Sequence, residues 1–123
     1  QGGIAYAESA EQAVYRELTE ETGLAKKDVE IVARTEGWLR YNLPEHLVRH
    51  YKHPVCIGQK QKWFMLRLLS NDTAVILDKN RRPEFDVWKW TDYWTPLNEV
   101  IAFKREVYKQ ALEYFEPTLL NKL

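Results

Sequence analysis

Three glutamates near the start of the chain have a spacing that could build a metal site. Glu17, Glu20 and Glu21 stand at i, i+3 and i+4, so on a helix their carboxylates project from one side, one turn apart. Like charges at this spacing destabilise a helix by roughly 0.2–0.5 kcal/mol per pair unless a cation compensates them. Between positions 2 and 24 the chain has five acidic residues and one basic residue, Arg16, which we expect to pair with Glu20. One arginine cannot satisfy three glutamates, so the pattern favours a bound cation.

The chemistry of the three carboxylates indicates which cation they would bind. Carboxylates suit hard ions such as Mg²⁺ or Mn²⁺, which take oxygen ligands. Zinc is disfavoured because the only cysteine is Cys56, expected to be an inert apolar residue, and no Cys/His pair has finger-like spacing. His46, His50 and His53 have suggestive spacing, but a metal site needs more than spacing. The alternative for the glutamates is an ordinary solvated acidic helix face.

Local signals predict the helix that carries the glutamates. Ser9 and Gln12 form a capping-box pattern, and Gly23 suits the left-handed residue after the end, so a helix is expected over residues 10–21. Its apolar stripe, at i, i+4 and i+8, consists of Ala10, Val14 and Leu18.

The rest of the chain predicts strands followed by a helix. Residues 28–35 alternate as a half-buried strand, and residues 38–43 read as its hairpin partner, with Glu36 and Gly37 near the turn. Further strands are expected at 61–69, 73–77 and 84–90, with Trp88 and Trp90 in the core. A helical period runs over 97–115 and Pro117 marks its end. This order predicts one α+β domain, residues 1–123, with a mixed sheet flanked by helices.

Composition sets the remaining bounds. The chain has 123 residues, of which 45% are hydrophobic and 29% charged, as in an ordinary soluble domain. Basic and acidic residues number 18 each, so any contact with nucleic acid must be local. A single cysteine and the lack of a membrane-length apolar run favour a reducing cytoplasm and no membrane partner.

The spacing of the first segment resembles a known signature. Gly2 is followed after five residues by Glu8 and after seven more by RELTEETGL at 16–24, which resembles the signature of the Nudix hydrolases. The resemblance implies a Nudix-like α/β/α sandwich, with structural roles for Arg16, Glu8 and Gly23. It also implies metal ligands at Glu17, Glu20 and Glu21, a backbone carbonyl ligand from the Gly2-Gly3 segment, and a further ligand or general base at Glu84.

Later blocks extend the resemblance over nearly the whole chain. The segments 38–44, 54–64, 82–90 and 100–108 resemble the bacterial RNA pyrophosphohydrolase subfamily. That resemblance implies Mg²⁺-dependent hydrolysis of the 5′-triphosphate end of RNA to a 5′-monophosphate with release of pyrophosphate, which initiates RNA decay. Dinucleoside polyphosphate hydrolysis and a catalytically weak Nudix-like binding or regulatory module stay open as alternatives, as does an activating protein partner.

Substrate contacts are expected from aromatic and cationic residues. Phe103 stacks on a base in the resembled enzymes, where neighbouring Lys104 could hold a phosphate. Phe103 could equally fill the core. Gln59, Lys60 and Lys62 resemble a strip beside the RNA, or else a solvated strand edge, and Arg40 and Tyr41 are weaker candidates.

Two departures from the pattern bear on activity. Ala5-Tyr6-Ala7 stands where the subfamily has a Pro-Gly turn, so the glycine loop is expected to sit differently, which puts the carbonyl ligand and the role of Glu8 in question. The chain also opens inside the signature, so we expect the domain to be N-terminally incomplete, with its first strands missing.

Overall fold

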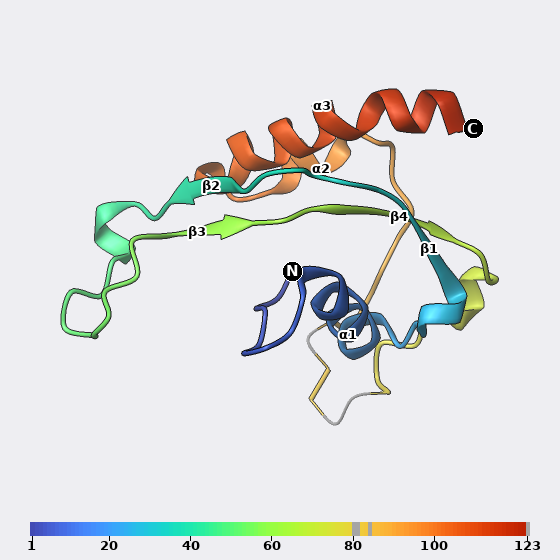
Figure 1. The fold of residues 1–123 in the computed structure, drawn as a ribbon, viewed down its shortest axis with the longest axis horizontal. Helices are drawn as coiled ribbons and strands as arrows, with labels where there is room; N and C mark the ends of the chain where they lie inside the picture. Colours follow the sequence, from blue (N-terminus) through green and yellow to red (C-terminus); the bar gives the residue numbers. More distant parts are fainter. Residues whose placement is uncertain (80–81, 84, 123) are drawn as a thin grey trace. The chain divides into compact units, whose positions relative to one another are not determined.

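The structure is a computed structural model that describes residues 1–79, 82, 83 and 85–122 (Figure 1). It contains both helices and strands, which confirms the predicted α+β class. No helix in these ranges is long and apolar enough to cross a membrane. The chain divides into two compact units: unit 1 is Gln1–Val32 with Phe64–Trp90, and unit 2 is Ala33–Trp63 with Thr91–Leu123.

Helix α1 of unit 1, Ala10–Thr22, forms as predicted. At its start the Ser9 hydroxyl accepts from the Gln12 amide at 3.1 Å, and the Gln12 side chain accepts from the Ser9 amide at 2.9 Å. At its end Gly23 adopts the left-handed conformation, with φ of 76°. Ala13 is the buried apolar residue of the helix, whereas the predicted stripe is half-buried (Ala10, Val14, Leu18). Local hydrogen bonds therefore fix both ends of the helix and the direction of its glutamates.

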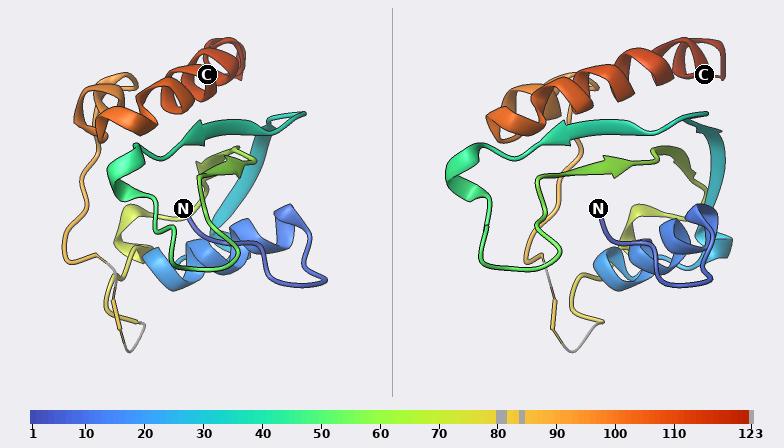
Figure 2. Two further views of the ribbon diagram at one scale, coloured as in Figure 1. Left: turned by 90° about the vertical axis from the view of Figure 1, so that its left-hand side faces the viewer. Right: turned by 60° about the vertical axis from the view of Figure 1, so that its left-hand side comes forward.

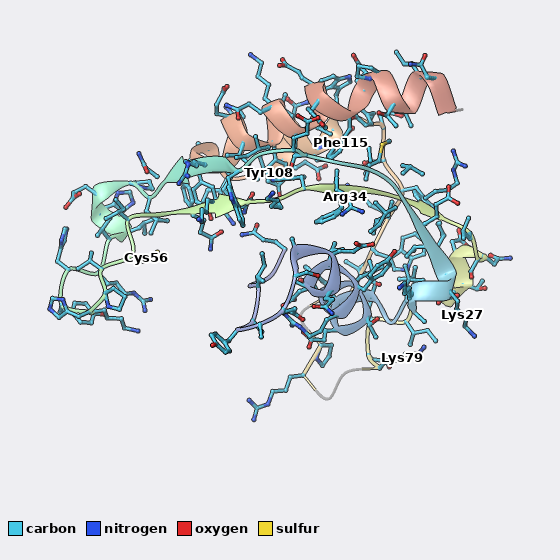
Figure 3. The ribbon with its side chains drawn as sticks, viewed as in Figure 1. Lys27, Arg34, Cys56, Lys79, Tyr108 and Phe115 are labelled. Carbon is cyan, nitrogen blue, oxygen red and sulfur yellow. The ribbon has the colours of Figure 1, made fainter. Side chains whose placement is uncertain are left out.

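A later segment of unit 1 docks on the end of α1. The Ile76 amide donates to the Thr22 carbonyl at 2.8 Å, and Lys79, labelled in Figure 3, donates from Nζ to the Gly23 carbonyl at 3.1 Å. A methyl group on Gly23 would lie 2.6 Å from the Ile76 carbonyl oxygen. These contacts satisfy carbonyls that a helix end otherwise leaves without partners.

The strands are hydrogen-bonded in two pairs over the described part of the chain. Strand β1, Val29–Arg34, pairs with β4, Phe64–Leu68, and β2, Leu39–Asn42, pairs antiparallel with β3, Gly58–Gln61. Short 3₁₀ turns precede β1, follow β2 and follow β4: η1 at Lys26–Asp28, η2 at Glu45–Leu47 and η3 at Asp72–Ala74.

Helix α3 lies along the β2–β3 ladder in unit 2, as the views in Figures 1 and 2 agree. The unit also contains α2, Thr95–Glu99, and η4, Ala102–Lys104, before α3, Arg105–Lys122. Its buried core joins one residue of β2 to three of α3: Tyr41, Val107, Ala111 and Phe115. The rings of Tyr108 and Trp63 meet edge to face with their centroids 5.0 Å apart, and burial raises the pKa of Tyr108.

The predicted hairpin between 28–35 and 38–43 is wrong. Both strands form, but each pairs with the segment 58–68 rather than with the other. Thr35 explains the change, because its amide donates to the Trp63 carbonyl and its hydroxyl accepts from the Trp63 amide, each at 3.0 Å. The bend at Glu36 and Gly37 thus leads from β1 to β2 without pairing the two strands.

The strand predicted at 61–69 is interrupted, and the one predicted at 73–77 is absent. Gln61 ends β3, and Lys62 and Trp63 separate it from β4. The other segment begins in η3, where the Asn71 side chain accepts from the Thr73 amide. That local cap competes with an extended backbone.

The segment 85–90 is not a strand, contrary to the prediction for 84–90. No described strand pairs with it, so its alternating side chains have no sheet to cover. Trp88 and Trp90 are exposed at 40% and 69%, and their rings meet edge to face at 5.9 Å. The prediction that both tryptophans lie in the core is therefore wrong.

The helix predicted over 97–115 is divided, and it does not end at Pro117. Val100 and Ile101 take extended backbone angles between α2 and η4, and α3 continues through Pro117. A proline removes one amide donor, but packing on both sides can hold a helix together. Here Phe115 is buried before the proline and Leu119 is half-buried after it.

Candidate active site

Arg16 links the glycine loop to the glutamates of α1. Its Nε and Nη2 donate to the two carboxylate oxygens of Glu8 at 2.8 and 3.0 Å. Nη2 also donates to the Gly3 carbonyl at 2.7 Å, and Nη1 donates to Glu17 at 2.9 Å. The expected pair with Glu20 is present, but at 3.4 Å it is the longest of these contacts. Arg16 therefore fixes the loop and Glu17 more than it fixes Glu20.

Glu8 closes the turn that departs from the family pattern. The Ala5 amide donates to its carboxylate at 2.9 Å, and its own amide donates to the Ala5 carbonyl at 3.0 Å. The hydrogen bonds from Arg16 and then from the Ala5 amide lower the pKa of Glu8 to about 2. Ala7 has φ of 63°, so an alanine adopts the left-handed conformation that glycine adopts without strain. The turn forms without proline or glycine, and Glu8 keeps its bond to Arg16.

The first residues of the chain run past two carboxylates of α1. A methyl group on Gly2 would lie 1.9 Å from the carboxyl carbon of Glu17, so only glycine fits while Arg16 holds that carboxylate. The amine nitrogen of Gln1 lies 3.3 Å from a carboxylate oxygen of Glu21. This brings the Gly2 backbone to the predicted ligands.

The predicted ligands are the carboxylates of Glu17, Glu20 and Glu21 and the Gly2 backbone carbonyl. All of these are oxygens, which suit a hard divalent cation. The space beside Gly2 admits no side chain. The side chains of Glu17 and Glu21 are 17% and 11% exposed and that of Glu20 is 45% exposed. Over the residues described, no three His, Cys, Asp or Glu side chains converge as a metal site would require, and this includes the three histidines. The glutamates share a helix, with Glu17 held by Arg16 instead of turned toward its neighbours.

Three further residues that the sequence brought into question are Glu84, His50 and Cys56. Glu84, the fourth predicted carboxylate, lies outside the described residues. His50 shares a hydrogen bond of 2.5 Å with Glu45 on the exposed loop after β2. Cys56, labelled in Figure 3, is exposed on the same loop, with its thiol 3.3 Å from the Gly58 carbonyl.

The six predicted substrate residues lie on the β2–β3 ladder and on η4. Those of the ladder divide between its two faces. Tyr41 is buried, donates to Gln59 at 2.8 Å and packs 5.7 Å from the half-buried ring of Phe103. Lys104 places Nζ 5.8 Å from the Tyr41 ring. Arg40 and Lys60 lie directly opposite each other on the other face.

The sequence predictions did not single out Trp38, although two lysines lie over its ring. Its side chain is 39% exposed, and Lys60 and Lys62 place Nζ 4.6 and 5.0 Å from its ring centre. The signal was its position two residues before Arg40, since alternate residues of a strand share a face.

Comparison with known proteins identifies relatives over nearly the whole chain. The NUDIX domain model matches residues 1–115. The RNA pyrophosphohydrolase of Pseudomonas putida is 58% identical over 122 residues, which cover 99% of this chain and 77% of the relative. Proteins of the same name from Pseudomonas entomophila and Pseudomonas syringae pv. tomato are 57% identical over the same shares. The signature glutamates, the Arg16 contacts and these matches lead to one conclusion: the chain belongs to the NUDIX domain family, the Nudix hydrolases.

Proposed function

We propose that this Nudix hydrolase converts the 5′-triphosphate end of RNA to a 5′-monophosphate and releases pyrophosphate, the step that initiates decay of the transcript. The observation that carries the proposal is the identity of 57–58% across 99% of the chain to proteins named RNA pyrophosphohydrolase. The same blocks that resemble this subfamily contain the aromatic and cationic residues of unit 2. A cytoplasmic location follows from the proposed substrate.

Members of the family need divalent metal ions, and here we propose Mg²⁺, with Mn²⁺ as a substitute. Glu17, Glu20 and Glu21 would hold the ion, together with the Gly2 backbone. When bound, such an ion neutralises charge on phosphate oxygens and activates water for attack.

Other residues of the chain would orient the metal ligands and bind the RNA. Arg16 orients Glu17 and, through Gly3 and Glu8, fixes the glycine loop that would supply the backbone ligand. Glu84 would add a carboxylate as ligand or general base. Phe103 and Lys104 would engage the first bases and phosphates of the RNA, with Tyr41 and Gln59 supporting them.

The deciding experiment compares two substrates on the same protein. With Mg²⁺ present, we expect faster release of pyrophosphate from a 5′-triphosphate oligoribonucleotide than cleavage of diadenosine tetraphosphate. The reverse order would overturn the proposal in favour of a dinucleoside polyphosphate hydrolase. No turnover of either substrate by the folded protein would instead indicate a binding or regulatory module.

A further inference from the structure

The register of β2 and β3 determines which side chains share the exposed face of their ladder. Arg40 lies opposite Lys60, and Tyr41 lies opposite Gln59. Because successive side chains alternate, Tyr41 and Gln59 point to the opposite face from Arg40 and Lys60. Tyr41 is buried near α3 and η4, so Arg40 and Lys60 belong to the outer face.

This outer face is positively charged along its length. Its ladder positions are Arg40, Asn42, Gly58 and Lys60, and Trp38 and Lys62 flank the strand ends, joined to this face by the contacts of Lys60 and Lys62 with the Trp38 ring. Together they include three cations and no acid. Like charges directly opposite each other destabilise a strand pair. In the part of the chain that the structure describes, neither Arg40 nor Lys60 forms an ion pair. The arrangement suits an anionic partner.

Trp38 adds an aromatic surface to these charges. The ammonium groups of Lys60 and Lys62 lie over its ring, and the Lys62 ammonium also donates to the Glu36 carbonyl at 3.3 Å. An exposed cation–π contact is weaker than stacking of a nucleobase on an aromatic ring, so a base could replace a lysine that then turns to a phosphate. An exposed aromatic among cations is the arrangement that binds single-stranded nucleic acid.

We infer that this outer face, formed by Trp38, Arg40, Lys60 and Lys62, binds the single-stranded RNA that follows the 5′ end. A nucleobase stacks on Trp38, and Arg40 and Lys60 contact the phosphodiester backbone. The inference deepens the proposed function and rests on it for the identity of the polymer. It assigns Trp38 a role in affinity for RNA rather than in the chemical step.

The experiment measures binding apart from hydrolysis. A labelled 5′-hydroxyl oligoribonucleotide of about ten nucleotides is titrated with the full chain at several salt concentrations. We expect Trp38→Ala to weaken binding about tenfold or more and Trp38→Phe to restore most of the affinity. Lys60→Gln should lower the slope of log affinity against log salt by about 0.7, the value for one phosphate contact of a single strand. Lys109→Gln, at an exposed position of α3, is the matched control and should leave the slope unchanged.

The outcomes separate this inference from the proposed function. Unchanged RNA affinity in both Trp38→Ala and Lys60→Gln overturns the inference, as does equal competition by poly-glutamate, which would indicate general anion binding. Wild-type protein that hydrolyses 5′-triphosphate RNA but does not bind the 5′-hydroxyl RNA also overturns it and leaves the function standing. RNA binding that depends on Trp38, in a protein without pyrophosphohydrolase activity, supports the inference and removes the function. Circular dichroism of each variant verifies folding, and Trp38→Phe and Lys60→Gln test the face even if Trp38→Ala does not fold.

Discussion

The segment from Gly2 to Gly23 and the β2–β3 ladder both gather charges of one sign, but they compensate those charges differently. In the first, Arg16 binds Glu8, Glu17 and the Gly3 carbonyl, so the loop and the helix are held together from within. In the second, Arg40 and Lys60 oppose each other without an acid on their face. The loop and the helix of the first region are thus held together by internal contacts, whereas the second region leaves its charge for a bound polyanion to compensate.

The largest effect should come from Glu20, which Arg16 holds less tightly than Glu17. Glu20→Gln should reduce hydrolysis more than about 100-fold, because loss of an outer partner alone costs about 10–100-fold in metalloenzymes. Its side chain is 45% exposed, so the free energy of unfolding should change by less than about 0.5 kcal/mol. Initial rates at saturating Mg²⁺ and urea unfolding test both parts, with Glu113→Gln as the charge-matched control on α3. Retained hydrolysis would remove Glu20 from the metal site.

Replacing Arg16 tests whether the first region is held from within. Arg16→Gln should lower hydrolysis about 10–100-fold, and Arg16→Lys should recover only part of it, because an ammonium group cannot reproduce the paired bonds to Glu8. Rates for both variants, together with Glu8→Gln and the double variant Glu8→Gln/Arg16→Gln, give the coupling. Additive losses would show that Arg16 and Glu8 do not act as a unit.

Acid should loosen the same contact at an unusually low pH. The pKa of Glu8 is about 2 in the fold, against an ordinary value of 4.5. A lowered pKa means that the carboxylate stabilises the fold fully above about pH 4.5, and that this contribution is lost as the pH falls through about 2. NMR titration of the Glu8 carboxyl carbon measures this directly. A midpoint near 4.5 would mean that Arg16 does not hold Glu8 in solution.

The two regions also differ in how much the sequence could predict. The limits of α1 depend on Ser9, Gln12 and Gly23, which act within a few residues, so pattern reasoning located the helix correctly. The partner of β2 depends on a strand beyond a long loop, and the turn signal at Glu36 and Gly37 favoured a false hairpin. Local rules describe caps well, whereas strand pairing depends on contacts distant in sequence.

The candidate site shows the same division. The resemblance to the family signature implied structural roles for Arg16 and Glu8, and the structure brings the two side chains together. Trp38 was missed because a tryptophan next to a strand fits a core as well as a surface, and only its contacts with Lys60 and Lys62 reveal its face. The core prediction for Trp88 and Trp90 is wrong for a different reason. A strand buries alternate side chains only when it joins a sheet, and this segment pairs with no described strand.

A smaller effect on stability is expected from backbone strain at Ala7, in the turn that precedes α1. Ala7→Gly should raise the free energy of unfolding by about 1 kcal/mol, because glycine adopts a φ of 63° without a Cβ clash. Ala5→Gly, at a position without positive φ, is the control and should lower it by about 0.4–1 kcal/mol through chain entropy. Urea unfolding of both variants measures the difference. If Ala7→Gly is no more stable than Ala5→Gly, the turn is not strained in solution.

The smallest effect separates stability from binding in the ladder. Arg40→Glu would replace a like-charge pair opposite Lys60 by an attractive one, so the free energy of unfolding should rise by about 0.2–1 kcal/mol while RNA affinity falls. Urea unfolding and RNA titration of the same protein sample test the two signs together, with Lys109→Glu on α3 as the control for net charge. A variant that loses both stability and affinity would show that Arg40 stabilises the fold, and the contrast with Arg16 would then disappear. A variant that gains stability as it loses affinity would show that the opposed cations of the ladder destabilise the free protein and contribute to RNA binding.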